Sequence, residues 1–225
     1  MKKMKLKIVC LLVALLCIPC YGQIAKSVVL DDWELIAQNA VRKGAEQNIT
    51  TWQSTTLHIA CGVTAATAHT GTKVSVQVSG VDSGDDAWYT LTEFIGPTGT
   101  ATPTTLTTIP NAGSSTILVP LLGIGTWGRF DDDGIRPIFV LGSPTVANSE
   151  IHTLVSHTVG AASSVTILDG LANLPGTSTV IWDLAETYIV ELPKHNNRVR
   201  VVYDNTNDSD GSTVYMRTSI YGVRE

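Results

Sequence analysis

Short runs in which apolar and polar residues alternate dominate this sequence. In the run 73–79 (KVSVQVS), valines occupy every second position and polar residues lie between them. Such period-two alternation is typical of a β-strand with one buried side and one side facing solvent. Similar runs lie at 56–61, 88–95, 187–192, 198–203 and 213–220, and clusters of Gly, Asp, Asn and Pro separate them. The pattern predicts antiparallel strands joined by turns.

A second group of shorter apolar runs lies in the middle of the chain, at 116–119, 137–141, 150–155 and 164–168. About five strands within some 70 residues suggest a small barrel, which avoids exposed edges by closing on itself. The stretch 96–110, rich in Thr, Pro and Gly, reads as the connection to it.

The fold class we predict is all-β. We expect an antiparallel β-sandwich, jelly-roll or immunoglobulin-like, formed by residues 23–110 and 183–225, with a small β-barrel of residues 111–182 inserted between its strands. Two independent domains laid end to end are the alternative. A helix over 34–46 is the one helical contender, but Gly44 weakens it and two strands are favoured.

Residues 1–22 carry the pattern of a secretory signal peptide. Four lysines lie within residues 1–7, and an apolar run follows from 8 to about 19. This run is shorter than the roughly 20 apolar residues of a membrane-spanning helix. We expect cleavage near Gly22 and secretion to the extracellular space or the cell surface. A lipid anchor on Cys17 or Cys20 is the alternative, although neither cysteine follows the small residue that such signals prefer.

Removal of the signal peptide makes the chain more acidic and leaves one cysteine. Four of the 15 basic residues are lost, so 11 remain against 20 acidic residues, a net charge of −9. Such a charge argues against nucleic acid as a partner. Cys61 is the only cysteine left, so no intrachain disulfide can form. It alternates with Leu57 and Ile59 and is expected to be buried.

The sequence contains no recognised catalytic or phosphate-binding motif, and we predict no catalytic residues and no enzyme activity. The histidines His58, His69, His152, His157 and His195 are spaced as isolated surface or loop residues rather than as metal ligands.

Three acidic loops are better candidates for a cation, at 82–86, 131–134 and 204–211. Calcium prefers six to eight oxygen ligands, which clustered carboxylates and amides supply. The best candidate is the last loop, with the tentative ligands Asp204, Asn205, Asp208 and Asp210. The alternative is that Asp, Asn and Gly are there because tight turns require them. No other cofactor is expected.

A contact surface is the remaining candidate. If the apolar residues of 198–203 and 213–221 point inward, three arginines and two tyrosines point outward on one sheet face, namely Arg198, Arg200, Tyr215, Arg217 and Tyr221. Arg and Tyr are enriched in interfaces. The alternative is ordinary cross-strand pairing with Glu191 and Glu93.

Four segments carry a weak family resemblance: 68–79 (AHTGTKVSVQVS), 91–96 (LTEFIG), 167–171 (ILDGL) and 198–205 (RVRVVYDN). They resemble segments of uncharacterised β-rich proteins of phage-like and environmental genomes, which implies a structural or accessory role. A virion protein assembled in the cytoplasm needs no signal peptide, so an exported, cell-encoded relative is favoured.

Together these features predict an exported, non-enzymatic structural protein that associates with itself, as a subunit of an extracellular filament, coat or surface assembly. The alternative is a secreted module that binds carbohydrate or a cell-surface polymer through aromatic rings, for which the candidates are Trp88, Trp127, Trp182 and Tyr215. The segment 23–32 is either a donor strand for a neighbouring subunit or a frayed tail.

Overall fold

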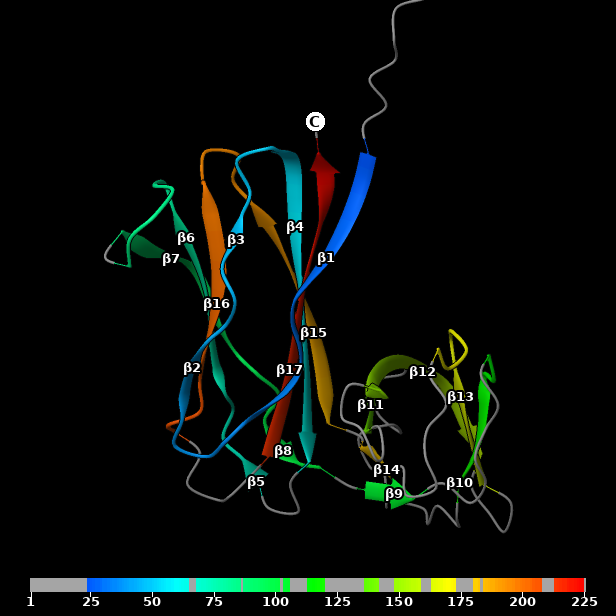
Figure 1. Cartoon of the computed structure of the whole chain (residues 1–225). Helices are drawn as coiled ribbons and strands as arrows, with labels where there is room; N and C mark the ends of the chain where they lie inside the picture. The colour runs from blue at the N-terminus through cyan, green and yellow to red at the C-terminus, as the bar shows by residue number, and fades with distance from the viewer. Residues whose placement is uncertain are drawn as a thin grey trace, which may run out of the picture.

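The computed structural model describes residues 24–64, 68–85, 87–101, 103–105, 113–119, 136–141, 148–158, 163–172, 180–182, 184–207 and 213–224. Most of these residues form antiparallel β-strands, and none forms an α-helix (Figure 1). Within these ranges no helix is long and apolar enough to span a membrane. The signal peptide predicted at 1–22 lies outside the described residues.

Two sheets packed face to face make up the sandwich (Figure 1). The four-stranded sheet has the order β1 (Ile24–Ile36), β17 (Thr213–Arg224), β4 (Trp52–Thr64) and β15 (Ala185–Leu192). The five-stranded sheet has the order β2 (Val41–Lys43), β16 (Arg198–Asp204), β6 (Lys73–Ser79) and β7 (Trp88–Ile95), and β3 (Gln47–Asn48) also pairs with β16. The expected β-sandwich is therefore confirmed. A two-stranded ribbon joins β5 (Ala68–His69) and β8 (Gly99–Thr100).

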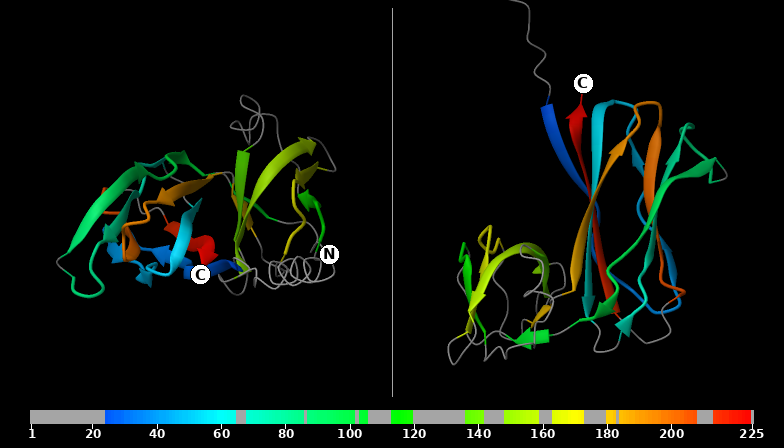
Figure 2. Two further views of the ribbon diagram at one scale, coloured as in Figure 1. Left: turned by 90° about the horizontal axis from the view of Figure 1, so that it is seen from above. Right: turned by 180° about the vertical axis from the view of Figure 1, so that it is seen from behind.

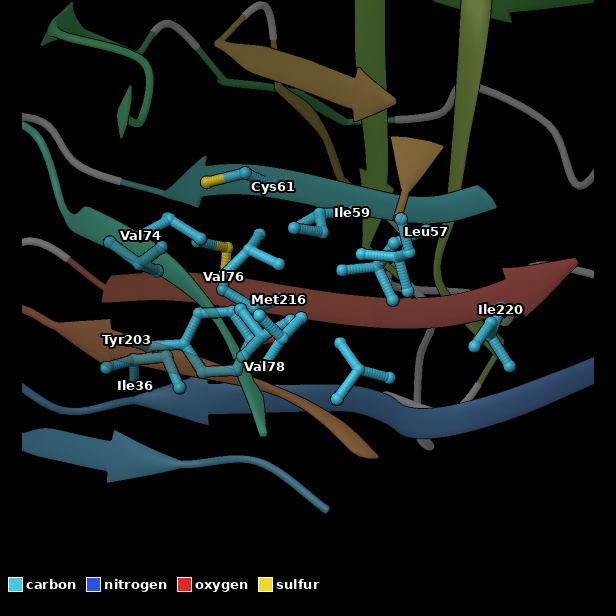
Figure 3. Packing of buried hydrophobic residues seen from close by; sticks show 14 of the residues in the cluster. Ile36, Leu57, Ile59, Cys61, Val74, Val76, Val78, Tyr203, Met216 and Ile220 are labelled. Atoms are coloured by element: carbon cyan, nitrogen blue, oxygen red, sulfur yellow. The ribbon is translucent and has the colours of Figure 1, made fainter. Parts of the chain in front are cut away.

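The alternating residues of the two sheets meet in one core (Figure 3). Val74, Val76 and Val78 are fully buried, as their spacing predicts, and they face residues of β4 and β17. Cys61 is also fully buried, and burial raises the pKa of its thiol. Each large apolar side chain buried here stabilises the fold by about 1.5–3 kcal/mol. This shared core keeps the two sheets packed against each other.

One long side of the sandwich is closed by aromatic side chains at the sheet edges. Tyr188 of β15 stacks on Phe94 of β7 with 3.9 Å between ring centroids. Its hydroxyl also donates a hydrogen bond to the Ile95 carbonyl oxygen at 3.0 Å, so a residue of one sheet is tied to the backbone of the other.

Six further strands form a separate sheet, in the order β10 (Thr116–Val119), β13 (Ser163–Ile167), β12 (Glu150–Thr158), β11 (Arg136–Leu141), β14 (Val180–Trp182) and β9 (Pro103–Thr105). It has its own apolar cluster, which includes Ile117, Ile138 and Val165. The expected barrel closure is wrong for the described strands. β10 and β9 lie at opposite edges, and a barrel requires its first and last strands to pair. β9 lies in the Thr- and Pro-rich stretch 96–110, which the sequence predicts to be a connection, and it forms the edge of the sheet opposite to β10.

The six-stranded sheet stands beside one end of the four-stranded sheet (Figure 2). Phe139 of β11 forms the contact, and its ring lies against the backbone of Gly62 in β4. Its centroid is 5.0 Å from that of Trp33 and 5.6 Å from that of Tyr215. A Cβ atom on Gly62 would lie 2.3 Å from the phenyl ring, so this approach requires glycine.

Residues 34–46 form the end of β1 and the strand β2, so the two strands favoured over a helix are confirmed. The described part of the candidate donor segment, from Ile24 to Asp32, also belongs to β1. It pairs with β17 of the same chain from the partners Ile24 and Arg224 onward. The described part of this segment is therefore neither a frayed tail nor a donor strand for a neighbouring subunit, because its backbone pairs with β17 of its own chain.

Irregular pairing in β1 turns Asp31 into the sandwich. The register shifts on both sides of Asp31, and its side chain is buried. One carboxylate oxygen accepts a hydrogen bond from the Ala45 amide at 2.9 Å, which joins β1 to the segment between β2 and β3. The other oxygen has no hydrogen-bond partner among the described residues. Burial raises the pKa of Asp31, and the Ala45 bond and the charge of Arg42 offset only part of this effect.

We expect Asp31→Asn to raise the free energy of unfolding at pH 7 and to leave it nearly unchanged at pH 4. The pKa of Asp31 is higher in the folded chain than in the unfolded chain, so the ionised group opposes folding at neutral pH. As the pH falls through the folded-state pKa, the native chain binds this proton first, and that opposition disappears. Urea unfolding of both proteins at several pH values measures the difference. A difference in the free energy of unfolding between the two proteins that increases as the pH falls would contradict a raised pKa for Asp31.

Candidate functional site

The two arginines proposed as contact residues at the start of β16 are part of the fold. Arg198 and Arg200 lie on the outer face of the five-stranded sheet, but their side chains are only 8% and 6% exposed. Both guanidinium groups lie over the ring of Trp88, at 4.6 and 4.2 Å from its centroid. Cation–π contacts of this kind stabilise a pair by about 0.5–2 kcal/mol.

Each arginine is also satisfied by hydrogen bonds within the chain. Arg198 binds Glu46 at 2.8 Å and donates to the carbonyl oxygens of Val81 and Gly84 at 2.9 and 2.7 Å. Arg200 binds Asp85 at 2.6 Å and Gln77 at 2.9 Å. These bonds fasten the loop between β6 and β7 to β16. The partners expected from the sequence, Glu191 and Glu93, are not the ones found.

The other three candidates lie on a different sheet. Tyr215, Arg217 and Tyr221 are on β17, which belongs to the four-stranded sheet, and they point to its outer face. The expectation of one common face is therefore wrong, because alternation predicts which side of a strand a residue takes but not which sheet the strand joins. The structure brings Arg198 and Arg200 together and separates them from the three β17 residues.

The β17 residues differ in what covers them. Tyr215 is packed against Phe139 of the six-stranded sheet. Arg217 forms an ion pair with Asp32 of β1 at 3.4 Å. Tyr221 lies at the uncovered end, 43% exposed, with its ring 4.5 Å from that of His58. From Tyr215 to Tyr221, the outer face of β17 thus changes from a part that the six-stranded sheet covers to a part that is exposed to solvent.

The open end carries exposed apolar side chains on the two outer strands of the sheet, β1 and β15, joined by a cross-strand row of residues. Val29, Ser219, His58 and Ile189 are successive cross-strand partners, and Tyr221 lies next to this row. Val29 is 43% exposed and Ile189 is 66% exposed. We call these five residues the β17 patch. Exposed apolar side chains that lie near one another and near an exposed tyrosine indicate an interaction surface more strongly than a single one does.

A groove of about 200 Å³ runs between the β17 patch and the six-stranded sheet. Its floor is the outer face of the four-stranded sheet, and Ile151 of β12 contributes from the other side. The remaining lining residues are Trp33, His58, Ile59, Ala60, Thr187, Arg217, Ser219 and Tyr221. An aromatic ring at the rim and a guanidinium group beside polar hydroxyls give it both stacking and hydrogen-bonding capacity.

Sequence reasoning found Tyr221 and Arg217 but missed Val29, Ile189 and Ile151. A signal for Ile189 was present, since it falls between Thr187 and Glu191 on the polar side of β15. An isoleucine at a position expected to face solvent indicates a contact surface. Ile151 had no such signal, because its neighbours come from another sheet.

The structure describes only two of the four residues predicted as calcium ligands. Asp204 accepts hydrogen bonds from the Thr206 amide at 3.0 Å and hydroxyl at 2.6 Å, and these bonds lower its pKa. Asn205 is fully buried, and its amide group binds Thr72 and the Ala37 carbonyl oxygen. The Asp204 side chain thus stabilises the turn, and the Asn205 side chain joins it to two distant segments of the chain. The other two, Asp208 and Asp210, lie outside the described residues.

The described acidic residues of the loop between β6 and β7, and the buried histidine His152, are bonded to other residues of the chain. In the loop between β6 and β7, Asp82 accepts a hydrogen bond from Asn197, and Asp85 is paired with Lys43 and Arg200. The loop at 131–134 and the residue Trp127 lie outside the described part of the chain. His152 is buried and bonded to Glu150 at 2.6 Å. Across the ranges that the structure describes, no three His, Cys, Asp or Glu side chains are grouped as metal ligands.

The three described aromatic residues considered as sugar platforms all pack against other side chains of the chain. Trp88 has its ring beneath the two arginines, and Tyr215 packs against Phe139. Trp182 packs against both the sandwich core and the Phe139 cluster. Tyr221 is the described aromatic side chain that combines exposure with a position beside the groove.

No protein-family model and no curated protein matches this sequence. Among solved structures, the chain is similar to VP17, a capsid protein of bacteriophage P23-77, with a TM-score of 0.19 and 7% identity over 91% of this chain and 98% of that chain. It is also similar to a chain of the VP16–VP17 complex of the two major capsid proteins of that phage, with a TM-score of 0.20 and 7% identity over 90% and 99% of the two chains. The all-β chain thus has a weak structural resemblance to phage capsid proteins, and the function proposed below is argued from its own geometry.

Proposed function

We propose that this protein is an exported, non-enzymatic structural subunit that assembles with copies of itself into an extracellular filament, coat or surface layer. The β17 patch would be the main contact surface between subunits. The observation that carries this proposal is the cross-strand row from Val29 to Ile189, in which the apolar side chains of Val29 and Ile189 and the His58 ring are exposed and Ser219 is buried between them.

The chemistry of the two outer faces supports the choice of the four-stranded sheet. On the five-stranded sheet, the charged groups of Arg198, Arg200 and Asp85 are paired with one another or with neighbours. On the four-stranded sheet, Ile189 and Val29 are exposed beyond the end of the six-stranded sheet's contact. Covering one such side chain by a second subunit contributes about 1.5–3 kcal/mol. Because Tyr and His accompany them, the patch can combine apolar burial with hydrogen bonds at its rim.

We expect Ile189→Lys to raise the concentration at which the mature protein assembles by about tenfold or more, which corresponds to at least about 1.4 kcal/mol. The matched control is Val41→Lys. Val41 is 57% exposed at a β2 position on the other sheet, opposite Asp204. Light scattering over a concentration series, followed by negative-stain microscopy, measures the effect.

A mature protein that stays monomeric at high concentration, with and without calcium, would rule out assembly. Equal effects of the two lysine variants would rule out the β17 patch as the contact. Export is tested separately by the mass of the protein recovered from the medium. Secretion predicts a chain that starts near residue 23, whereas a lipid anchor predicts a membrane-bound chain that starts at Cys17 or Cys20.

The second candidate function is carbohydrate binding, which the groove beside Tyr221 favours. Aromatic rings stack on sugar rings, and Arg217, Thr187 and Ser219 offer hydrogen-bonding groups beside the ring. Binding on a glycan array that Tyr221→Ala abolishes, together with a change in tryptophan fluorescence, would support this function over assembly. A monomeric protein with no glycan bound would remove both.

A further inference from the structure

The turn between β3 and β4 contains a triplet of residues whose sequence matches a modification signal. Asn48, Ile49 and Thr50 follow one another, with the asparagine at the end of β3 and the threonine in the turn. Asparagine followed two residues later by serine or threonine, with no proline between them, is the acceptor pattern for N-linked glycans in exported proteins. The sequence pattern alone is common, so the geometry at these residues decides whether it is usable.

The side chains of the triplet adopt a defined arrangement. The backbone amide of Thr50 donates to Oδ1 of Asn48 at 3.0 Å, and the Thr50 hydroxyl donates to the same oxygen at 2.7 Å. Both donors bind the carbonyl oxygen, so the Asn48 nitrogen Nδ2 is the part of the amide that they leave unused. Both residues are exposed to solvent. The nucleophilic atom and the hydroxyl group are therefore held together at the surface.

The neighbouring residue keeps this arrangement in place. Ile49 is only 4% exposed and belongs to the core of the sandwich. Its amide donates to the Asn197 carbonyl oxygen at 2.8 Å, and its own carbonyl oxygen accepts from Trp52 at 3.0 Å. A buried middle residue forces the two flanking side chains outward. The triplet is thus anchored at its centre and accessible at both ends.

The position of the turn also leaves room for a large group. β3 pairs with β16 on one side, through Asn48 and Arg198, and no pairing on its other side is seen among the described strands. The turn lies at the end of the sandwich that is opposite to the six-stranded sheet (Figure 1). A glycan here would extend from this end of the sandwich, away from the six-stranded sheet.

We propose that Asn48 is an acceptor for an N-linked oligosaccharide. This inference rests on the export proposed above, because the donor, a lipid pyrophosphate-linked oligosaccharide, is found on the export route. In the transfer, Nδ2 of Asn48 forms a bond to the anomeric carbon of the sugar, and the bond from that carbon to the pyrophosphate oxygen breaks. The lipid pyrophosphate leaves, and the Nδ2 proton passes to a base of the transferase.

The acceptor pattern requires a hydroxyl group at position 50, so substitutions of Thr50 test the proposal. Thr50→Ser keeps a hydroxyl group at the same position, whereas Thr50→Ala removes it and leaves Asn48 intact. Thr50 is exposed, so neither change disturbs the core. A second triplet of the same pattern, at 207–209, provides an internal comparison, since Asn207→Gln removes it without altering Asn48.

The test is to secrete the full chain from a host that carries an oligosaccharyltransferase and to map glycans by peptide mass spectrometry before and after enzymatic deglycosylation. We expect a glycan on Asn48 that is lost in Asn48→Gln and Thr50→Ala, and retained in Thr50→Ser and Asn207→Gln. A secreted, correctly cleaved chain without a glycan on Asn48 overturns the proposal, and so does a Thr50→Ala variant that is modified as fully as the Thr50→Ser variant.

Failure of export is distinguished by a second protein, in which the host's own signal sequence replaces residues 1–22. If the chain is secreted only with the host signal and carries the glycan on Asn48, the acceptor site stands and the proposed export fails. If it is secreted with either signal and remains unmodified at Asn48, the acceptor site fails and the export stands.

Discussion

Phe139→Ala is expected to lower the free energy of unfolding by about 3–5 kcal/mol, the range found when a buried phenyl ring is removed. Phe139 is fully buried and fills the junction between the six-stranded sheet and the four-stranded sheet, against Trp33, Gly62 and Tyr215. Its loss leaves a cavity at the place where the two parts of the chain meet. Urea unfolding followed by the tryptophan fluorescence of the chain measures the change.

Gly62→Ala provides the matched variant for this junction. The added methyl group would lie 2.3 Å from the Phe139 ring, so one of the two must move, which costs about 1–3 kcal/mol. In the double variant the methyl group enters the space that the ring has left. We therefore expect the double variant to be more stable than the sum of the single effects predicts, by about 0.5–3 kcal/mol. Strict additivity would show that the two residues do not contact one another.

Arg198→Ala is expected to lower the free energy of unfolding by about 2–3 kcal/mol without weakening assembly. The variant loses a buried charged donor and leaves the carbonyl oxygens of Val81 and Gly84 without it. The effect stays below that of a fully buried ion pair, because Glu46 is 42% exposed and can be hydrated again.

The control for this prediction is Arg217→Ala. The Arg217 side chain is 39% exposed and its ion pair with Asp32 spans 3.4 Å, so its loss should cost less than about 1 kcal/mol. Arg198→Lys should recover little, because lysine cannot donate in the two directions that the guanidinium group uses. Chemical unfolding and light scattering on the same samples separate stability from assembly. Loss of assembly in Arg198→Ala at unchanged stability would contradict this assignment.

The alternation of residues predicted the strands of the sandwich well. The valines of β6 face inward, Cys61 is buried, and the residues around Gly44 form strands and not a helix. These features depend on the local periodicity of side chains, which a sequence displays directly. Among the described strands, β16 pairs with β6 and β17 pairs with β4, so strands late in the chain lie beside strands of its first block.

The features that the sequence did not predict depend on contacts between distant segments. Arg198 is bonded to Glu46, which lies 152 positions away, and no periodicity links the two. The contact of Phe139 with Gly62 joins two sheets and leaves no pattern in either strand. β9 was missed because Pro103–Thr105 has no apolar alternation, and its pairing with β14 is set by the rest of the sheet. Alternation also could not tell that β16 and β17 belong to different sheets.

The position of β17 within its sheet has a consequence for the order in which the chain can fold. β17 lies between β1 and β4, so it supplies the hydrogen-bonding partner that both of them need. It is also the last strand in the chain, and the bond between Thr64 and Thr213 spans 149 positions. Contacts of such long range form late and slowly. While the chain is being synthesised, β1 and β4 therefore lack the strand that lies between them until residues 213–224 have been made, and the four-stranded sheet can be completed only after that.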